Sequence, residues 1–142
     1  MATLFSPRWG ADLLIKKLNE LFKVGTGHSH NGVDSRGVMH GVASYTADGA
    51  ITITPGVVDL AKTSAAAMTI AAPTTAQNGT IMLLINSTAY AHVVTFTGST
   101  LNNGTSAAKI TATFPAYVGG ALRLLAYGGK WYAHGYINVT IA

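Results

Sequence analysis

The first part of the chain repeats apolar residues at helical spacing. In residues 6–23, SPRWGADLLIKKLNELFK, leucines recur every three or four positions and form one apolar stripe. Ser6 can cap this segment, and Pro7 suits a first helical turn because its missing N–H would have no partner there. The pattern predicts a short amphipathic helix within residues 1–24.

Two roles are open for this helix: packing on its own domain, or anchoring the chain to a larger assembly. Glycines at positions 25, 27, 32, 37 and 41 follow it and predict a Gly/His-rich linker over residues 25–43 with little regular structure. Because such a linker would separate the helix from the rest of the chain, we favour the anchoring role. The residues expected to make the anchoring contact are Trp9, Leu14, Leu18, Leu21 and Phe22.

From residue 44 onward, the apolar residues lie in short runs that are rich in β-branched side chains. Turn signals separate these runs, and the paired glycines of Tyr127-Gly128-Gly129-Lys130 predict the clearest hairpin. The expected strands cover residues 50–54, 57–62, 67–72, 80–86, 91–97, 108–114, 121–127, 130–136 and 137–142. Strands at this spacing are typical of a compact antiparallel sandwich or barrel. The predicted fold is therefore mainly β, with a short N-terminal α-helix followed by an antiparallel β-domain over residues 44–142.

Several expected strands are apolar on both faces, notably IMLLI (81–85) and LRLLA (122–126). One face would serve the domain core and the other a neighbouring copy of the chain. Composition agrees, because apolar residues make up 49% of the chain and charged residues only 10%, well under the usual quarter. We therefore predict self-association. The candidate interface residues are Ile81, Leu83, Leu122, Leu124 and Trp131.

Charge and composition argue against several classes of function. The net charge of +4 comes from nine Lys and Arg against five Asp and Glu, and the basic residues are scattered, which argues against nucleic-acid binding. The absence of cysteine excludes disulfides and thiol catalysis. No apolar run reaches the roughly 18 residues that span a bilayer, and the start of the chain lacks a secretory pattern. We expect a cytoplasmic product, or something assembled from one, with no membrane partner.

No set of residues in the sequence indicates catalysis. The five acidic residues are scattered, and neither a GxSxG elbow nor a phosphate-binding loop is present. His92 and His134 lie in strand-like runs and are expected to be hydrogen-bonded structural histidines. We predict that the protein is not an enzyme.

His28 and His30 are the candidate metal ligands. In an extended segment, residues two apart project to the same side, so both imidazoles can reach one ion. Three symmetry-related chains would supply six imidazoles, enough for the octahedral shell of a divalent transition metal, with Asp34 orienting a ligand. The alternative is that the histidines only hydrogen-bond across a polar hinge. The sequence leaves both open and favours the hinge.

Two long stretches carry further motifs: AAAMTIAAPTTAQNGTIMLLINSTAYAHVVTF (65–96) and TFPAYVGGALRLLAYGGKWY (113–132). The motifs are Ala72-Pro73, Asn78-Gly79, Ala91-His92-Val93 and the hairpin from Leu124 to Tyr132. They resemble a small β-domain of tailed-bacteriophage structural proteins, which include head fibres, capsid decoration proteins and some tail fibres. The segment GHSHNGVDS (27–35) is similar to the linker that precedes β-domains in phage fibres.

The resemblance covers roughly residues 50–142 and implies a homotrimeric virion protein, made in the host cytoplasm. HxH pairs in some fibres bind iron at the trimer axis, which implies an iron-like metal here. The N-terminal part lacks a repetitive shaft, which favours a head fibre or capsid decoration protein attached through its N-terminal region to phage capsid or tail proteins. The alternative is a tail fibre, tail appendage or receptor-binding module. In a receptor-binding module, the rings stacking on host-surface glycans would be Tyr90, Trp131, Tyr132 and Tyr136.

Overall fold

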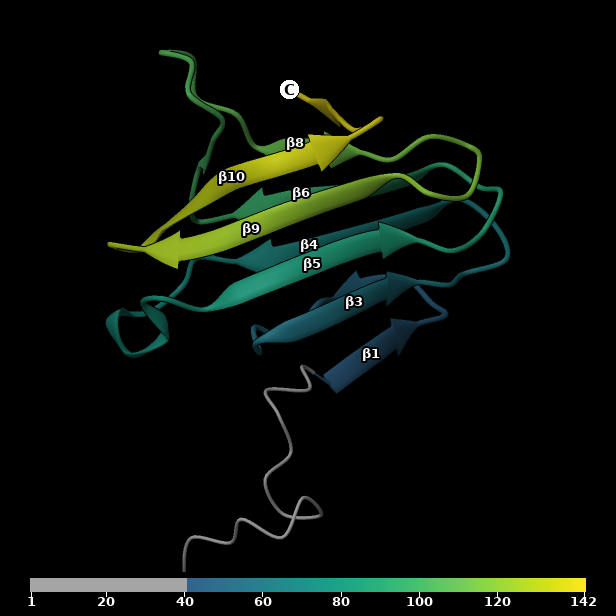
Figure 1. Ribbon diagram of the computed structural model, residues 1–142, viewed down its shortest axis with the longest axis horizontal. Coiled ribbons are helices and arrows are strands. Elements are labelled where there is room, and N and C mark those ends of the chain that lie inside the picture. The colour runs from purple at the N-terminus through teal and green to yellow at the C-terminus, as the bar shows by residue number, and fades with distance from the viewer. Residues whose placement is uncertain (1–40) are drawn as a thin grey trace, which may run out of the picture. The chain divides into compact units, whose positions relative to one another are not determined.

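Two mixed β-sheets make up residues 41–142, the part of the chain that the computed structural model describes (Figure 1). The mainly β fold is confirmed for these residues, while the predicted N-terminal helix and the linker up to residue 40 lie outside them. Residues 41–43, which we assigned to the linker, instead belong to the first strand, β1 (Gly41–Tyr45). Its backbone pairs with the strand that begins at Gly56, so regular structure starts earlier than predicted.

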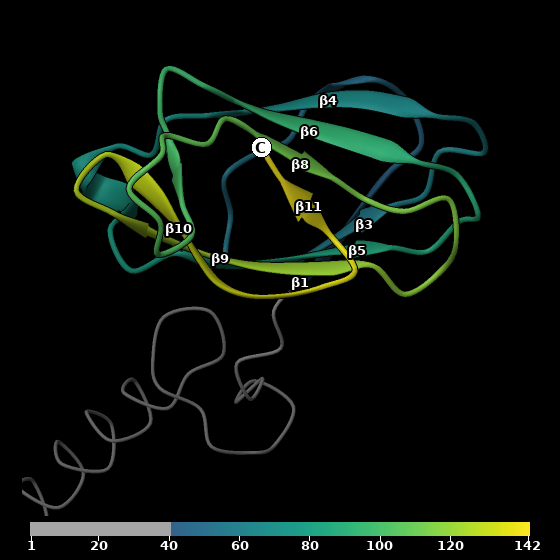
Figure 2. The ribbon, with the colours of Figure 1, turned by 90° about the horizontal axis from the view of Figure 1, so that it is seen from above.

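The two sheets lie one above the other as two layers (Figure 2). The six-stranded sheet contains, in spatial order, β1 (Gly41–Tyr45), β3 (Gly56–Leu60), β5 (Ile81–Asn86), β9 (Ala121–Tyr127), β10 (Lys130–Ile137) and β7 (Leu101–Asn102). The five-stranded sheet contains β11 (Thr140–Ile141), β8 (Thr111–Thr113), β6 (His92–Thr97), β4 (Ala66–Ala71) and β2 (Gly49–Ala50). One short 3-10 helix, η1 (Thr75–Gln77), lies between β4 and β5 in the chain.

The predicted antiparallel arrangement is wrong for the first half of the domain. The pairs β1–β3, β3–β5, β2–β4 and β4–β6 are all parallel, as is β7–β10. From β1 to β6 successive strands alternate between the two sheets, and each connection reverses the direction of the chain (Figure 1). Neighbours within one sheet are therefore separated by one strand of the other sheet and run in the same direction. Only the later pairs β5–β9, β9–β10, β6–β8 and β8–β11 are antiparallel.

The turn between β9 and β10 is the hairpin that the paired glycines predicted. Lys130 pairs with Tyr127 across the turn. Gly128 and Gly129 have φ angles of 58° and 74°, and residues that carry a Cβ atom rarely adopt such angles. Other strands are shorter than predicted: residues 50–54 contribute only the end of β2, and 108–114 contribute only β8.

The core between the sheets contains three residues that we had assigned to a trimer interface. Leu122, Leu124 and Trp131 each have 0% of their surface exposed, so they cannot contact another copy and that part of the prediction is wrong. The reason is the two-residue alternation of β9, in which Leu122 and Leu124 point inward and Arg123 points outward. The other two candidates, Ile81 and Leu83, remain 36% and 37% exposed.

Trp131 joins the two sheets. Its indole is fully buried and starts from β10 in the six-stranded sheet. The indole Nε1 donates a hydrogen bond of 2.9 Å to the carbonyl oxygen of Ala71, in β4 of the five-stranded sheet. Apolar burial and one directed hydrogen bond therefore act together at this point of the core.

Replacing Trp131 with Ala is expected to lower the free energy of unfolding by about 3–5 kcal/mol, the usual range for truncating a large aromatic side chain in a core. Trp131→Phe keeps much of the packing but removes the donor to Ala71, and should cost about 1–3 kcal/mol. Urea unfolding followed by circular dichroism measures both losses. Tyr127→Ala is the control, because the Tyr127 side chain is 63% exposed and is not in the core. A loss as large as that of Trp131→Ala in the control would contradict this description of the core.

Candidate functional site

The outward side chains of the six-stranded sheet form an apolar surface, which we call the outer face. Strand register places them in three rows across the sheet: Ile81, Leu125 and Tyr132; Val57, Leu83 and Arg123; Asp59, Ile85, Ala121 and Ile137. Figure 1 looks onto this sheet, with the five-stranded sheet behind it. Most of the rows are apolar, although their side chains point away from the core.

The apolar rows are open to solvent in the single chain. Ile137 is 61% exposed, and Ile81, Leu83 and Tyr132 are each more than one third exposed. A shallow hollow of about 270 Å³ lies among Gly56, Val57, Ile81, Leu83 and Arg123. Apolar side chains that lie together on a surface typically mark a contact with another molecule. The outer face is therefore the candidate interaction surface of this domain.

The three rows of the outer face contain one acid and one base, on different strands. Asp59 lies on β3 and Arg123 on β9, with β5 between the two strands. The Ser44 hydroxyl donates a hydrogen bond of 2.9 Å to Oδ2 of Asp59. The other carboxylate oxygen, Oδ1, is buried and has no hydrogen-bond partner among residues 41–142. The outer face is therefore asymmetric in charge: its negative charge lies on β3 and its positive charge on β9.

Of the predicted interface residues, Ile81 and Leu83 lie on the outer face; Val57, Arg123 and Leu125 also lie there but were not among the predicted residues. β9 reads ALRLLAY, so its apolar residues occupy both faces and hydrophobicity alone does not decide which leucines point outward. The signal that decides is Arg123, because a charged side chain in mid-strand marks the solvent-facing positions. Positions 121, 123 and 125 then lie outward, and 122 and 124 inward.

A buried polar cluster lies beside the core and includes His92, the first residue of β6. Its imidazole is fully buried, and Nε2 lies 2.8 Å from the Thr88 hydroxyl. Thr88 in turn donates to the carbonyl oxygen of Lys62 at 3.1 Å. The prediction of a hydrogen-bonded structural histidine is confirmed for His92, whereas His134 is exposed.

The Thr88–His92 pair lacks the features of a nucleophile and its base. Nδ1 of His92 is buried without a hydrogen-bond partner in residues 41–142, so no carboxylate orients the ring. The imidazole also has no exposed surface through which a substrate could approach. The hydrogen bonds of Thr88 connect the loop before β6 to the loop after β3 and to His92.

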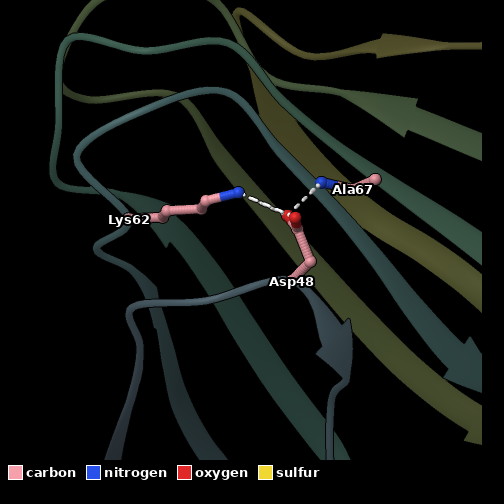
Figure 3. Close-up of polar contacts among 3 residues, drawn as sticks. All are labelled: Asp48, Lys62 and Ala67. Atoms are coloured by element: carbon pink, nitrogen blue, oxygen red, sulfur yellow. Dashed lines mark hydrogen bonds and ion pairs between the residues drawn. The ribbon is translucent and has the colours of Figure 1, made fainter.

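Lys62 and Asp48 form an exposed ion pair in the same region (Figure 3). The Lys62 ammonium lies 2.8 Å from both carboxylate oxygens of Asp48, and Asp48 Oδ1 accepts a hydrogen bond of 2.9 Å from the backbone N–H of Ala67. The Lys62 hydrogen bond, followed by the Ala67 backbone donor, lowers the pKa of Asp48. Asp48 thus fastens the loop before β2 to the start of β4, and its role is structural.

The predicted metal and anchoring residues lie outside the described residues. This concerns His28 and His30, together with Trp9, Leu14, Leu18, Leu21 and Phe22, and both assignments stay predictions. Within residues 41–142, no group of three or more His, Cys, Asp or Glu side chains is placed to hold a metal ion. In the same range, no helix has the length and apolar character needed to cross a membrane.

Burial of His92 predicts a pH dependence of stability. Desolvation lowers the pKa of His92 below its ordinary value of 6.5, and the charge of Lys62 lowers it further. Below this pH the unfolded chain therefore binds more protons than the folded one, so stability that is fully present above pH 6.5 decreases as the pH falls. His92→Gln, which offers an amide nitrogen near the Nε2 position, should flatten this dependence.

The measurement is urea unfolding at about pH 7.5 and about pH 5.5, a range over which histidines titrate. His134→Gln is the matched control, since it removes an exposed imidazole. Equal pH dependence in the wild-type chain and in His92→Gln would contradict the predicted role of the buried imidazole.

Comparison with known proteins gives no match: no protein-family model, no curated protein and no solved structure is significantly similar to this chain. The likeness to phage β-domains thus depends on the motifs within residues 65–96 and 113–132, and the comparisons add no support to it.

Proposed function

We propose that this chain is a structural virion protein of a tailed bacteriophage. It forms a homotrimeric head fibre or capsid decoration protein that is attached to the particle through its N-terminal region. The observation that carries the assembly part of the proposal is the outer face, which leaves Ile81 and Leu83 in water in a single chain. The phage context comes from the motifs of residues 65–96 and 113–132.

The size of the apolar contribution is compatible with stable association. Fully burying a leucine or isoleucine contributes about 1.5–3 kcal/mol. Ile81 and Leu83 are 36% and 37% exposed, so covering what remains is worth about 0.5–1 kcal/mol for each side chain. Tyr132, Ile137 and the other outer-face residues add to this, and each contact is repeated around a closed assembly.

A cyclic arrangement also suits the two charges of the outer face. In a ring of identical copies, each chain contacts its two neighbours through different parts of its surface. Asp59 on β3 of one copy can then face Arg123 on β9 of the next. A face-to-face dimer about a two-fold axis would form the same pair twice, so the two charges set the register of the contact, and the trimer is taken from the resemblance to phage fibres.

Leu83→Asp in the full chain is expected to convert the trimer into monomers at about 10 µM. The introduced carboxylate would have to lose its water against an apolar neighbour, which costs several kcal/mol when the charge is unpaired. Light scattering coupled to size-exclusion chromatography gives the mass, and circular dichroism verifies that the variant is folded.

Ile110→Asp is the matched control, because Ile110 is 52% exposed but is not part of the outer face. It should leave the mass of the assembly unchanged. A wild-type chain that is monomeric at the same concentration, or a Leu83→Asp variant that stays trimeric, would overturn the proposed interface.

Attachment to the particle is tested separately, with the double variant Leu14→Glu and Leu18→Glu. Glutamates in the predicted apolar stripe should abolish co-sedimentation with phage particles that lack the native protein, while the trimer persists. Lys16→Glu makes the same change of charge two residues from both Leu14 and Leu18, on the other side of the predicted helix, and should still attach. Undiminished attachment of the double variant would exclude the anchoring role, and cryo-electron microscopy of decorated particles distinguishes a head position from a tail position.

A further inference from the structure

An open cleft of about 520 Å³ lies at the margin of the sandwich, between the loop that follows β8 and the end of the chain. Its lining includes Thr113, Tyr117, Tyr136, Asn138 and Thr140. Tyr136 pairs with Leu122, whose side chain points into the core, so the Tyr136 ring lies on the core side of β10. The cleft is therefore separate from the outer face.

Two tyrosine rings line the cleft with half of their surface open to solvent. Tyr117 is 52% exposed and Tyr136 is 50% exposed. Tyr117 comes from the loop between β8 and β9, and Tyr136 from β10, so the two rings are contributed by separate elements. A tyrosine offers an apolar ring face together with a hydroxyl that donates and accepts hydrogen bonds. Such rings suit a ligand that is apolar on its faces and polar at its edges.

The polar groups of the cleft are all neutral. Asn138 supplies an amide with two donors and an acceptor, and Thr113 and Thr140 supply hydroxyls. None of the eight residues that line the cleft is acidic or basic. A phosphate, sulfate or carboxylate ligand would find no cation here, so the chemistry selects a neutral ligand rich in hydroxyl groups.

The loop that carries Tyr117 is held in place by buried hydrogen bonds. Asn86 is 1% exposed, and its Nδ2 donates to the carbonyl oxygens of Pro115 at 2.7 Å and of Tyr117 at 3.2 Å. The backbone of Asn86 also exchanges hydrogen bonds with Gly119 and Gly120, at 3.0 and 2.8 Å. Because the loop is fixed in advance, a ligand does not lose affinity in ordering it.

The opposite wall contains the one residue other than glycine in residues 41–142 that has a positive φ angle. Asn138, with φ of 53°, lies where the chain leaves β10 of one sheet and enters β11 of the other. Asparagine tolerates this conformation better than most residues. Backbone conformations of this kind cluster at ligand sites, where the side chain must point in a set direction.

We propose that this cleft binds a neutral saccharide. A sugar ring stacks on Tyr136 and Tyr117, and its hydroxyls exchange hydrogen bonds with the Asn138 amide and the hydroxyls of Thr113 and Thr140. The site does not depend on the proposed virion role or on the trimer. An open cleft of this kind gives weak binding per site, with a dissociation constant of about 1 mM.

The test is saturation-transfer NMR with the full chain. The probes are glucose, galactose, mannose, rhamnose, N-acetylglucosamine and N-acetylgalactosamine, each as monosaccharide and as short oligomer at about ten times the expected dissociation constant. Saturation transfer to the ring protons of at least one neutral probe is expected. Tyr136→Ala should weaken that binding by about tenfold or more, while Tyr127→Ala, which removes a tyrosine that is 63% exposed in the β9–β10 turn, should leave it unchanged.

Asn138→Gly tests the contact between the Asn138 amide and the sugar hydroxyls in a variant that is expected to fold. Glycine adopts positive φ angles readily, so this variant should remain folded and yet bind several-fold more weakly. Three outcomes would overturn the proposal: no transfer to any neutral probe, equal binding by wild type, Tyr136→Ala and Asn138→Gly, or tighter binding of acidic sugars such as glucuronic acid.

Discussion

A strand in a two-layer sandwich can bury only one of its two faces, and the surface of this protein follows from that constraint. β5 lies in the middle of the six-stranded sheet and is apolar on both sides. Met82 and Leu84 fill the core, whereas Leu83 points outward and has no layer above it within residues 41–142. A soluble single copy would be better served by a polar residue at that position. The proposed self-association would account for its apolar character.

The second feature that shapes the domain is a pair of polar side chains buried beside the core. Asn86 and His92 are the two buried polar residues of the described range, and both hold loops instead of strands. Asn86 donates to the carbonyl oxygens of Tyr90, Pro115 and Tyr117, so one amide fixes the segment that forms a wall of the proposed saccharide cleft. A buried amide with this many partners is costly to remove. The stability of the domain and the shape of the cleft therefore depend on the same side chain.

The sequence pattern predicted where the strands lie better than it predicted which strands pair and in which direction. Paired glycines identified the β9–β10 hairpin, because its pairing is local. Whether two strands run parallel depends on which sheet the intervening strand joins, and an inward valine or leucine packs alike in either sheet. In β9 both faces are apolar, so Leu122 and Leu124 were assigned to the wrong side although Arg123 marks the outward positions. Tyr117 and Asn138 meet at one cleft only through the folded topology, which no spacing rule anticipates.

The order of strand pairing has a consequence for how the chain acquires its structure during synthesis. β5 pairs with β9, β7 with β10 and β8 with β11, so each earlier strand waits for a partner that leaves the ribosome after it. Pairing between segments so far apart in sequence is slow. Until β9 and β10 emerge, the nascent chain exposes apolar strands such as β5 without their partners and without the Trp131 indole. The domain therefore completes its folding only after β9, β10 and β11 have emerged, and crowded nascent copies would be prone to aggregate in that interval.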